Sequence, residues 1–164
     1  MCNNLPNRKL LRLQKYDYSN AAAYFITICT KDRKTLFSLA EEASEATKMI
    51  EKVFNETIES FSGVESPIYV IMPNHFHAII TIPRANKDLS HNLSTIVQAF
   101  KSKSTLEYTK MVREGILPPF DKQLWQRSFY DHIIRNNDDY CETYKYIYEN
   151  PTNWKYDKLY SEDK

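Results

Sequence analysis

The pattern of hydrophobic and polar positions predicts three strands in the first half of the chain. Tyr24–Thr30 (YFITICT) is rich in β-branched and aromatic residues, which is typical of a strand. Ile68–Met72 and His75–Ile82 have the same character, and the Pro73-Asn74 pair between them is a turn signal. The last two strands therefore form a hairpin.

Helical spacing of hydrophobic residues follows the first strand and recurs after the hairpin. One apolar face comprises Ala46, Met49, Ile50, Val53, Phe54, Thr57, Ile58 and Phe61, and a second comprises Leu93, Ile96, Val97 and Phe100. Leu124–Asp131 predicts a fourth strand, and a third helix runs from about Asn137 to Asn150, where Pro151 ends it.

The predicted order is strand, helix, strand, strand, helix, strand, helix. Its first six elements form the split βαβ pattern of a ferredoxin-like sandwich. We therefore expect an α+β fold with a four-stranded antiparallel sheet and an extra C-terminal helix. Residues 1–20 form a basic N-terminal arm and residues 21–164 a single domain.

Composition removes several classes of protein. The 164 residues contain only two glycines, Gly63 and Gly115, and neither lies in a dinucleotide-binding or P-loop motif. The three cysteines show no CxxC spacing, which argues against a zinc knuckle. No apolar run is long enough for a membrane span, and the N-terminus lacks the apolar core of a secretory signal. We therefore expect a cytoplasmic protein with no membrane partner.

The tripeptide His75-Phe76-His77 holds the first candidate chemistry. Alternate residues of a strand share one face, so Phe76, Ala78 and the following alternate residues form a uniformly apolar face. The two histidines lie together on the opposite face. Two adjacent imidazoles can chelate a divalent ion, which needs at least one more ligand, or they can be polar residues of an exposed face.

The third helix holds the second candidate. Tyr140, Tyr144, Ile147 and Tyr148 make an apolar stripe at helical spacing, which indicates core packing. Tyr146 points away from this stripe, one turn before Asn150. Tyr146 can therefore attack an electrophile while Asn150 offers an oxygen to a metal, or the two are an exposed tyrosine and a helix stop.

Together these segments resemble the single-tyrosine HUH transposases, and within them the REP-associated tyrosine transposase branch. The matching segments are Tyr16-Asp17-Tyr18-Ser19, Tyr24–Thr30 followed by Lys31-Asp32-Arg33, Tyr69–Ile80, Ile96–Thr105, Leu124–Asn136, and Tyr146–Pro151 with Trp154. They occur in family order and span nearly the whole chain. The co-occurrence of the MPNHFH, FYDHIIRN and YI..NP segments makes the resemblance specific.

The resemblance implies a mechanism. In this family the paired histidines bind Mg²⁺ or Mn²⁺, here His75 and His77, and a polar residue completes the site, here Asn150. The nucleophile is the tyrosine of the C-terminal helix, here Tyr146; Tyr130 and Tyr148 rank lower. The implied activity is metal-dependent cleavage and rejoining of single-stranded DNA, often near hairpins or inverted repeats, through a 5′-phosphotyrosine. The family includes monomers and homodimers.

A DNA partner requires cations, although the formal net charge is only +1. Local candidates for phosphate contacts are Arg8, Lys9, Arg12, Lys15, Lys101, Lys103, Arg127 and Arg135. Each can equally be a solvated surface charge. For Trp125 two roles are open, namely stacking on a base and anchoring the core. For His132 two roles are also open, namely a hydrogen bond near the site and a hydrogen bond to the backbone.

Two other functions compete with this interpretation. A non-catalytic nucleic-acid-binding module on the same sandwich needs aromatic consensus strands, which YFITICT and HFHAII do not supply. A metal-dependent phosphohydrolase would use an activated water and would not need Tyr146. A covalent adduct between tyrosine and single-stranded DNA separates all three.

Overall fold

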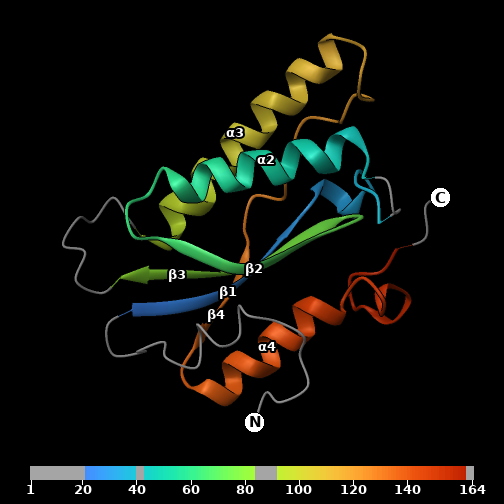
Figure 1. Cartoon of the computed structure of the whole chain (residues 1–164). Helices are drawn as coiled ribbons and strands as arrows, with labels where there is room; N and C mark the ends of the chain where they lie inside the picture. The colour runs from blue at the N-terminus through green and yellow to red at the C-terminus, as the bar shows by residue number, and fades with distance from the viewer. Residues whose placement is uncertain (1–20, 40–42, 84–91, 162–164) are drawn as a thin grey trace.

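Four antiparallel strands form the central sheet of this computed structural model, which describes residues 21–39, 43–83 and 92–161 (Figure 1). The strands are β1 (Ala21–Cys29), β2 (Glu65–Met72), β3 (His75–Pro83) and β4 (Tyr130–Ile134). Their order in the sheet is β2-β3-β1-β4, with every pair antiparallel. The predicted ferredoxin-like α+β architecture is confirmed, and β3 and β1 occupy its centre.

Three helices cover the two faces of this sheet. On one face lie α2 (Glu45–Glu59) and α3 (Leu93–Arg113), and on the other lies α4 (Asn137–Glu149), as Figure 1 shows. Two short 3-10 turns, η1 (Lys31–Arg33) and η3 (Trp154–Tyr156), follow β1 and α4. Each long helix begins at a side chain that accepts a backbone N–H bond, namely Ser44, Asn92 and Asn136.

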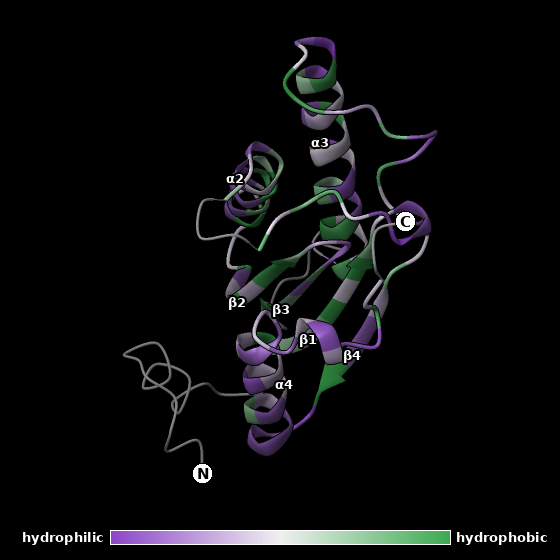
Figure 2. Cartoon of the chain, turned by 90° about the vertical axis from the view of Figure 1, so that its right-hand side faces the viewer, coloured by the Kyte–Doolittle hydropathy of each residue, from purple (hydrophilic) through white to green (hydrophobic). Residues whose placement is uncertain are grey.

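The alternation along β3 divides its side chains between two hydrophobic clusters. Phe76, Ala78 and Ile80 belong to the large cluster under α2 and α3, as the sequence predicted. Ile79 points the other way and packs with residues of α4 in a smaller cluster. In Figure 2 the hydrophobic colour is concentrated in the strands between these helical layers. The two histidines of β3 therefore lie on the α4 side.

The fourth strand is displaced from its predicted position. Leu124–Asp131 was predicted as a strand, whereas β4 begins only at Tyr130. Leu124 and Trp125 are hydrophobic because they fill the large core, and the only ladder contact there is an isolated bridge from Trp125 to Thr30. The apolar run thus marks a buried loop that precedes the strand.

The stripe on α4 is confirmed for three of its four members. Tyr140, Tyr144 and Ile147 are buried, whereas Tyr148 is 52% exposed, so its assignment to the core was wrong. The helix covers a narrow part of the sheet, and Tyr148 lies beyond that contact. The basic arm, residues 1–20, lies outside the described residues. Among the helices of the described ranges, none is long and apolar enough to cross a membrane.

Candidate active site on the α4 face of the sheet

Strand β3 places two imidazoles side by side at its beginning. His75 and His77 are buried, with 0% and 2% of their surfaces exposed, and their ring centroids lie 4.5 Å apart. On the neighbouring strand β1, Cys29 pairs with His75 and Thr27 with His77. The shared face predicted from the HxH spacing is therefore present, but it is enclosed and not a solvated surface.

Neighbouring side chains fix the ring of His77. Its Nδ1 lies 2.9 Å from Thr27 Oγ1, and its ring stacks on Phe25 at a centroid distance of 5.2 Å. Burial, together with the adjacent His75, lowers the pKa of His77 to about 3, although the charge of Asp157 acts in the opposite direction. The imidazole is therefore neutral at pH 7, which is the form that binds metal ions.

The ring of His75 is held by Asn74, the preceding residue in the turn. Asn74 Oδ1 lies 2.7 Å from His75 Nδ1. Burial lowers the pKa of His75 to about 4 and Arg33 acts in the same direction, although the charge of Asp157 opposes both. The second nitrogen, Nε2, is buried and has no hydrogen-bond partner among the described residues. A buried nitrogen without a partner is costly unless a ligand occupies it.

Helix α4 brings Tyr146 and Asn150 over these imidazoles. The Tyr146 hydroxyl lies 3.4 Å from His77 Nε2, and its ring packs edge-on against Phe25. Asn150 follows one helical turn later, is 3% exposed, and has a buried Oδ1 without a hydrogen-bond partner in the described chain. The geometry thus brings together all four residues that the sequence assigned to nucleophile and metal ligation.

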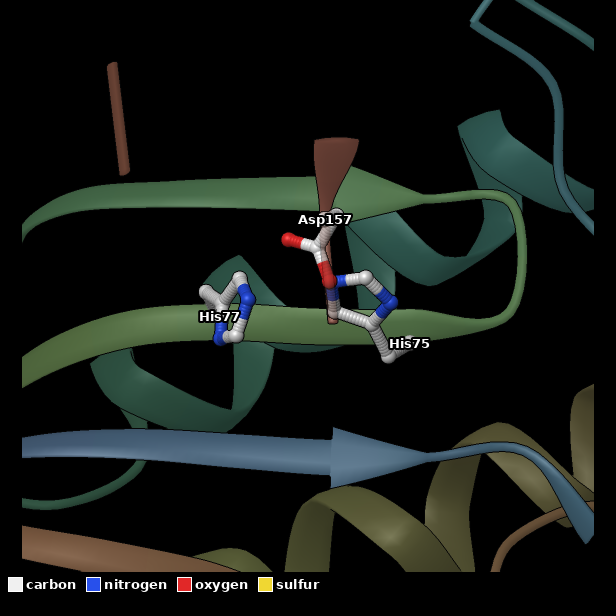
Figure 3. A group of neighbouring side chains, drawn as sticks. All are labelled: His75, His77 and Asp157. Atoms are coloured by element: carbon white, nitrogen blue, oxygen red, sulfur yellow. The ribbon is translucent and has the colours of Figure 1, made fainter. Parts of the chain in front are cut away.

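Asp157 joins this group, and the sequence analysis missed it. It follows η3, and its Oδ2 accepts hydrogen bonds from Asn150 Nδ2 at 2.7 Å and from the Tyr146 hydroxyl at 3.2 Å. Potential ligand atoms of His75, His77 and Asp157 all lie within 4.8 Å of one another (Figure 3). No motif marks an aspartate in the irregular segment after Pro151, so only the tertiary fold reveals it.

Asp157 and Tyr146 have shifted pKa values, and the charge of Asp157 contributes to the shift of Tyr146. Burial alone would raise the pKa of the Asp157 carboxyl, but hydrogen bonds from Leu159 N and the Asn150 amide outweigh it, and the pKa is lowered. Burial, together with the negative charge of Asp157, raises the pKa of Tyr146 to about 12. Ionisation of this phenol therefore requires a nearby positive charge.

The donor set suits a divalent cation. It offers two neutral imidazoles, one carboxylate and the free amide oxygen of Asn150, and two of these atoms are buried without partners. Mixed nitrogen and oxygen donors of this kind bind Mn²⁺. They also suit Mg²⁺, which prefers oxygen donors to nitrogen donors. A bound cation would also supply the positive charge that favours ionisation of Tyr146.

An open pocket gives access to Tyr146. It has a volume of about 650 Å³ and is lined by residues including His77, Tyr146, Asp157 and Lys158. The Tyr146 side is open, because 45% of that residue is exposed, whereas His77, which also lines the pocket, is only 2% exposed. An extended substrate can therefore reach the phenol without opening the core.

The predicted DNA-contacting residues fall into different settings. Arg8, Lys9, Arg12 and Lys15 lie outside the described residues, whereas Lys103, Arg127 and Arg135 are exposed on the surface. Lys101 is half-buried, its ammonium donating to the backbone carbonyls of Gln126 and Arg127. Burial lowers its pKa. Among the candidates that the structure describes, Lys103, Arg127 and Arg135 are therefore the ones whose side chains are free to meet phosphates.

Two further candidates have structural partners. Trp125 is 4% exposed, and its Nε1–H donates to Ser104 Oγ at 2.9 Å, so it is the core anchor and base stacking by this buried ring is ruled out in this conformation. His132 Nε2 lies 3.0 Å from both carboxylate oxygens of Asp139 at the start of α4. It therefore braces the helix that holds Tyr146 and does not touch the histidine pair's ligand group.

Comparisons with known proteins identify the family to which the chain belongs. The family described as "Transposase IS200 like" matches residues 18–150. An uncharacterised protein of Haemophilus influenzae is 30% identical over 170 residues, spanning 95% of this chain and 94% of that protein. A REP-associated tyrosine transposase of Escherichia coli K12 is 32% identical over 83 residues, spanning 51% of this chain and 41% of that protein.

A solved structure supports the same fold. The structure of a REP-associated tyrosine transposase bound to a REP hairpin aligns with a TM-score of 0.57 at 22% identity. The alignment covers 88% of this chain and 74% of that one. At this identity the likeness concerns the fold, while the family match rests on the sequence. The chain belongs to the family of IS200-like transposases, with REP-associated tyrosine transposases among its relatives.

Proposed function

We propose that the protein is a metal-dependent transposase that cleaves and rejoins single-stranded DNA through a covalent bond to Tyr146. The observation that carries this proposal is the position of the phenol. Its hydroxyl lies within 3.4 Å of both His77 Nε2 and Asp157 Oδ2, next to buried ligand atoms that lack partners. A tyrosine that served only for packing would not need this polar surrounding.

The metal-binding role falls to His75, His77 and Asp157, with Asn150 as a further oxygen donor. We propose Mg²⁺ or Mn²⁺ as the native ion. Such an ion, when bound, polarises a non-bridging oxygen of the scissile phosphate and stabilises the negative charge that develops there. The chain contributes a rigid cradle, because Thr27 and Asn74 already orient the two imidazoles.

Tyr146 carries out the bond exchange. Its phenolic oxygen attacks phosphorus while the bond from phosphorus to the 3′ oxygen breaks, so a 5′-phosphotyrosine forms and a 3′-hydroxyl leaves. The phenolic hydroxyl donates a hydrogen bond to Asp157 Oδ2, which orients it. The phenolic proton passes to solvent during the attack, and the leaving oxygen takes up a proton from solvent. The new phosphodiester has about the same energy as the old one, so a 3′-hydroxyl can reverse the step without ATP.

The proposed substrate is single-stranded DNA that carries a hairpin or inverted repeat. A relative in Escherichia coli is a REP-associated transposase, and the fold neighbour is bound to a REP hairpin. The open pocket beside Tyr146 admits an extended strand, and Lys158 on its wall offers a positive charge for a phosphate. Monomer and homodimer are both compatible with this chemistry.

A labelled oligonucleotide tests this function. The DNA flanking the gene is searched for inverted repeats, and single strands that contain them are incubated with the purified protein and Mn²⁺. We expect a denaturation-resistant protein–DNA adduct and a free 3′-hydroxyl fragment, both of which disappear in excess EDTA. Binding without cleavage would indicate a non-catalytic nucleic-acid module, and cleavage without an adduct would indicate a hydrolase that uses water.

A further inference from the structure

A second hollow lies next to the catalytic pocket, between α3 and the segment that leads to β4. Its volume is about 640 Å³. Figure 2 shows the chain returning from the far end of α3 toward β4. The floor includes the apolar side chains of Leu106, which is exposed, and Phe129, which is half-buried. The rim includes Gln98, Lys122 and Arg127. The groove is thus apolar at its base and polar along its edges.

The charged residues of this groove are all of one sign. Lys101, Lys122 and Arg127 line it, and none of its lining residues in the described part of the chain is an aspartate or glutamate, although the whole chain has nearly as many acidic residues as basic ones. Lys122 and Arg127 are exposed. Cations above an apolar floor suit a flexible polyanion with flat apolar groups, which describes single-stranded nucleic acid.

The groove is preformed and adjacent to the pocket beside Tyr146. The Lys101 ammonium donates to the carbonyls of Gln126 and Arg127, which fastens the wall segment to α3. Gln126 and Phe129 line both this groove and the pocket beside Tyr146. A strand whose phosphate lies at Tyr146 can therefore continue into the groove without a change in the protein.

We propose that this groove binds the single-stranded DNA that flanks the scissile phosphate. Lys122 and Arg127 contact its phosphates, and the bases face the apolar floor. The proposal rests on the function proposed above, because it takes the phosphate at Tyr146 as the fixed point of the strand. It adds a second binding surface, away from the histidines and the tyrosine, that sets affinity for the strand.

The test compares two double charge reversals by fluorescence anisotropy. The probe is a labelled 30-nucleotide single strand of mixed sequence, measured between 50 and 200 mM salt with EDTA present. We expect Lys122→Glu/Arg127→Glu to weaken binding at least tenfold and to reduce the salt slope by about 1.4, or roughly 0.7 per lost phosphate contact. The control, Lys48→Glu/Lys52→Glu, makes the same charge change on exposed residues of α2 and should weaken binding less than threefold.

Each outcome decides the matter. Equal loss in both double variants, or no loss in the groove variant, would overturn the groove while leaving the catalytic proposal intact. A duplex of the same length that binds as tightly as the single strand would also overturn it. If the unaltered protein does not bind single-stranded DNA at all, the groove and the proposed function both fail.

A separate observation concerns Asn74, which is completely buried in the turn between β2 and β3. Its amide nitrogen donates to Leu159 O at 2.8 Å and to Ser161 Oγ at 3.0 Å. Ser161 Oγ in turn donates to the carbonyl of Arg33, so it accepts the bond from Asn74. Both amide protons of Asn74 are therefore used on the C-terminal segment.

This arrangement determines which ring nitrogen of neutral His75 carries the proton. With its nitrogen occupied, Asn74 presents only its oxygen to His75 Nδ1, at 2.7 Å. An oxygen acceptor requires a donor, so the neutral imidazole carries its proton on Nδ1 and leaves the lone pair on Nε2. Nε2 is the buried atom without a partner. We infer that Asn74 is a positioning residue that holds His75 in the tautomer able to bind metal.

Nitrogen NMR of the metal-free protein at pH 8 reads this tautomer directly. We expect His75 to be protonated on Nδ1 in the unaltered protein; protonation on Nε2 would overturn the inference. Asn74→Ala should shift His75 toward a tautomer mixture and weaken Mn²⁺ binding, measured by calorimetry, by 10- to 100-fold. Asn74→Asp keeps the oxygen acceptor and loses both amide donors.

This second variant separates orientation of His75 from attachment of the C-terminal segment. We expect Asn74→Asp to retain the Nδ1–H tautomer and to bind Mn²⁺ at least tenfold more tightly than Asn74→Ala. A purely structural role would impair both variants alike. Equal Mn²⁺ affinity in Asn74→Ala and the unaltered protein would contradict the inference.

Discussion

The two faces of the sheet differ in what they enclose. Under α2 and α3, the β3 side chains Phe76, Ala78 and Ile80 join a continuous apolar cluster. On the α4 side, Ile79 packs in a smaller cluster, and the same strand face then becomes polar at His77 and His75. One face is therefore purely structural, whereas the other is divided between packing and chemistry.

The division follows from how α4 crosses the sheet. Its first two turns bury Tyr140 and Tyr144 against the sheet, and its last turn brings Tyr146 and Asn150 over the histidines. One helix thus packs on the sheet at one end and presents Tyr146, the proposed nucleophile, at the other. The comparison teaches that most of the packing lies on the α2–α3 face. Residues of the candidate site on the α4 face can therefore be replaced while the protein stays folded, as long as the α2–α3 core is intact.

The largest expected effect is on the structural face. Phe76→Ala removes a fully buried ring that lies 4.7 Å from Phe54 and 5.1 Å from Phe100. We expect a loss of about 3–5 kcal/mol of unfolding free energy, because a cavity remains where the ring was. Urea denaturation measures it. A loss below about 1 kcal/mol would show that this face is not the main core.

Acid should destabilise the metal-free protein through the other face. Unfolded histidine takes up a proton near pH 6.5, whereas burial keeps the pKa of His75 at about 4 and of His77 at about 3. The unfolded state therefore binds more protons in this window, and stability present above pH 6.5 is lost as pH falls toward 3. The lowered pKa of Asp157 adds to the loss only at the acidic end.

We expect the unfolding free energy in EDTA to drop by roughly 2 kcal/mol between pH 7 and pH 4, after allowing for partial hydration of the site. Chemical denaturation at each pH measures this slope. His75→Gln/His77→Gln should flatten the profile, because the groups that bind the extra protons in the unfolded state are gone. An unchanged slope in that variant would place the acid sensitivity elsewhere.

Replacing one histidine should separate activity from stability. His77→Ala removes a ligand and a ring stacked on Phe25, so we expect a loss of about 1–2 kcal/mol of unfolding free energy and a folded protein. Mn²⁺ binding and DNA cleavage should both disappear. Calorimetry and the adduct assay measure them on the same preparation. Full cleavage by His77→Ala would remove this residue from the site.

The smallest expected effect is at the anchor beside the groove. Trp125→Phe keeps an aromatic ring in the core but loses the bond from Nε1 to Ser104. We expect about 1 kcal/mol of destabilisation, since a buried hydroxyl loses its donor. Thermal unfolding measures this, and single-stranded DNA affinity should stay within twofold. If the free energy of DNA binding fell by more than the free energy of unfolding, Trp125 would have to contact a base in the complex.

The sequence predicted the regular part of the molecule well because its signals are local. The alternation in His75–Ile82 sets the face of each β3 residue, and the α4 periodicity separates Tyr146 from Tyr140 and Tyr144. The same local patterns paired His75 with His77 on one strand face and Tyr146 with Asn150 on one helix face. Only the family resemblance joined the two pairs into one site. Family resemblance then supplied the roles expected for these residues.

What the sequence did not predict depends on tertiary contacts. Asp157 lies in an irregular segment, and only the turn η3 brings its carboxylate to Asn150 and Tyr146. Leu124 and Trp125 predicted a strand because a buried loop and a buried strand are both made of hydrophobic residues, and sequence alone does not distinguish them. Asn74 read as a turn residue, and its bonds to Leu159 and Ser161 are visible only after folding.

The most direct test of the central claim maps the covalent bond. The protein is incubated with single-stranded hairpin DNA and Mn²⁺, digested with nuclease and protease, and analysed by tandem mass spectrometry. We predict a nucleotide phosphate on the peptide that contains Tyr146, and its complete loss in Tyr146→Phe with single-stranded DNA affinity unchanged within about twofold. A modified Tyr130, which is 60% exposed on β4, or an adduct that persists in Tyr146→Phe would contradict the account.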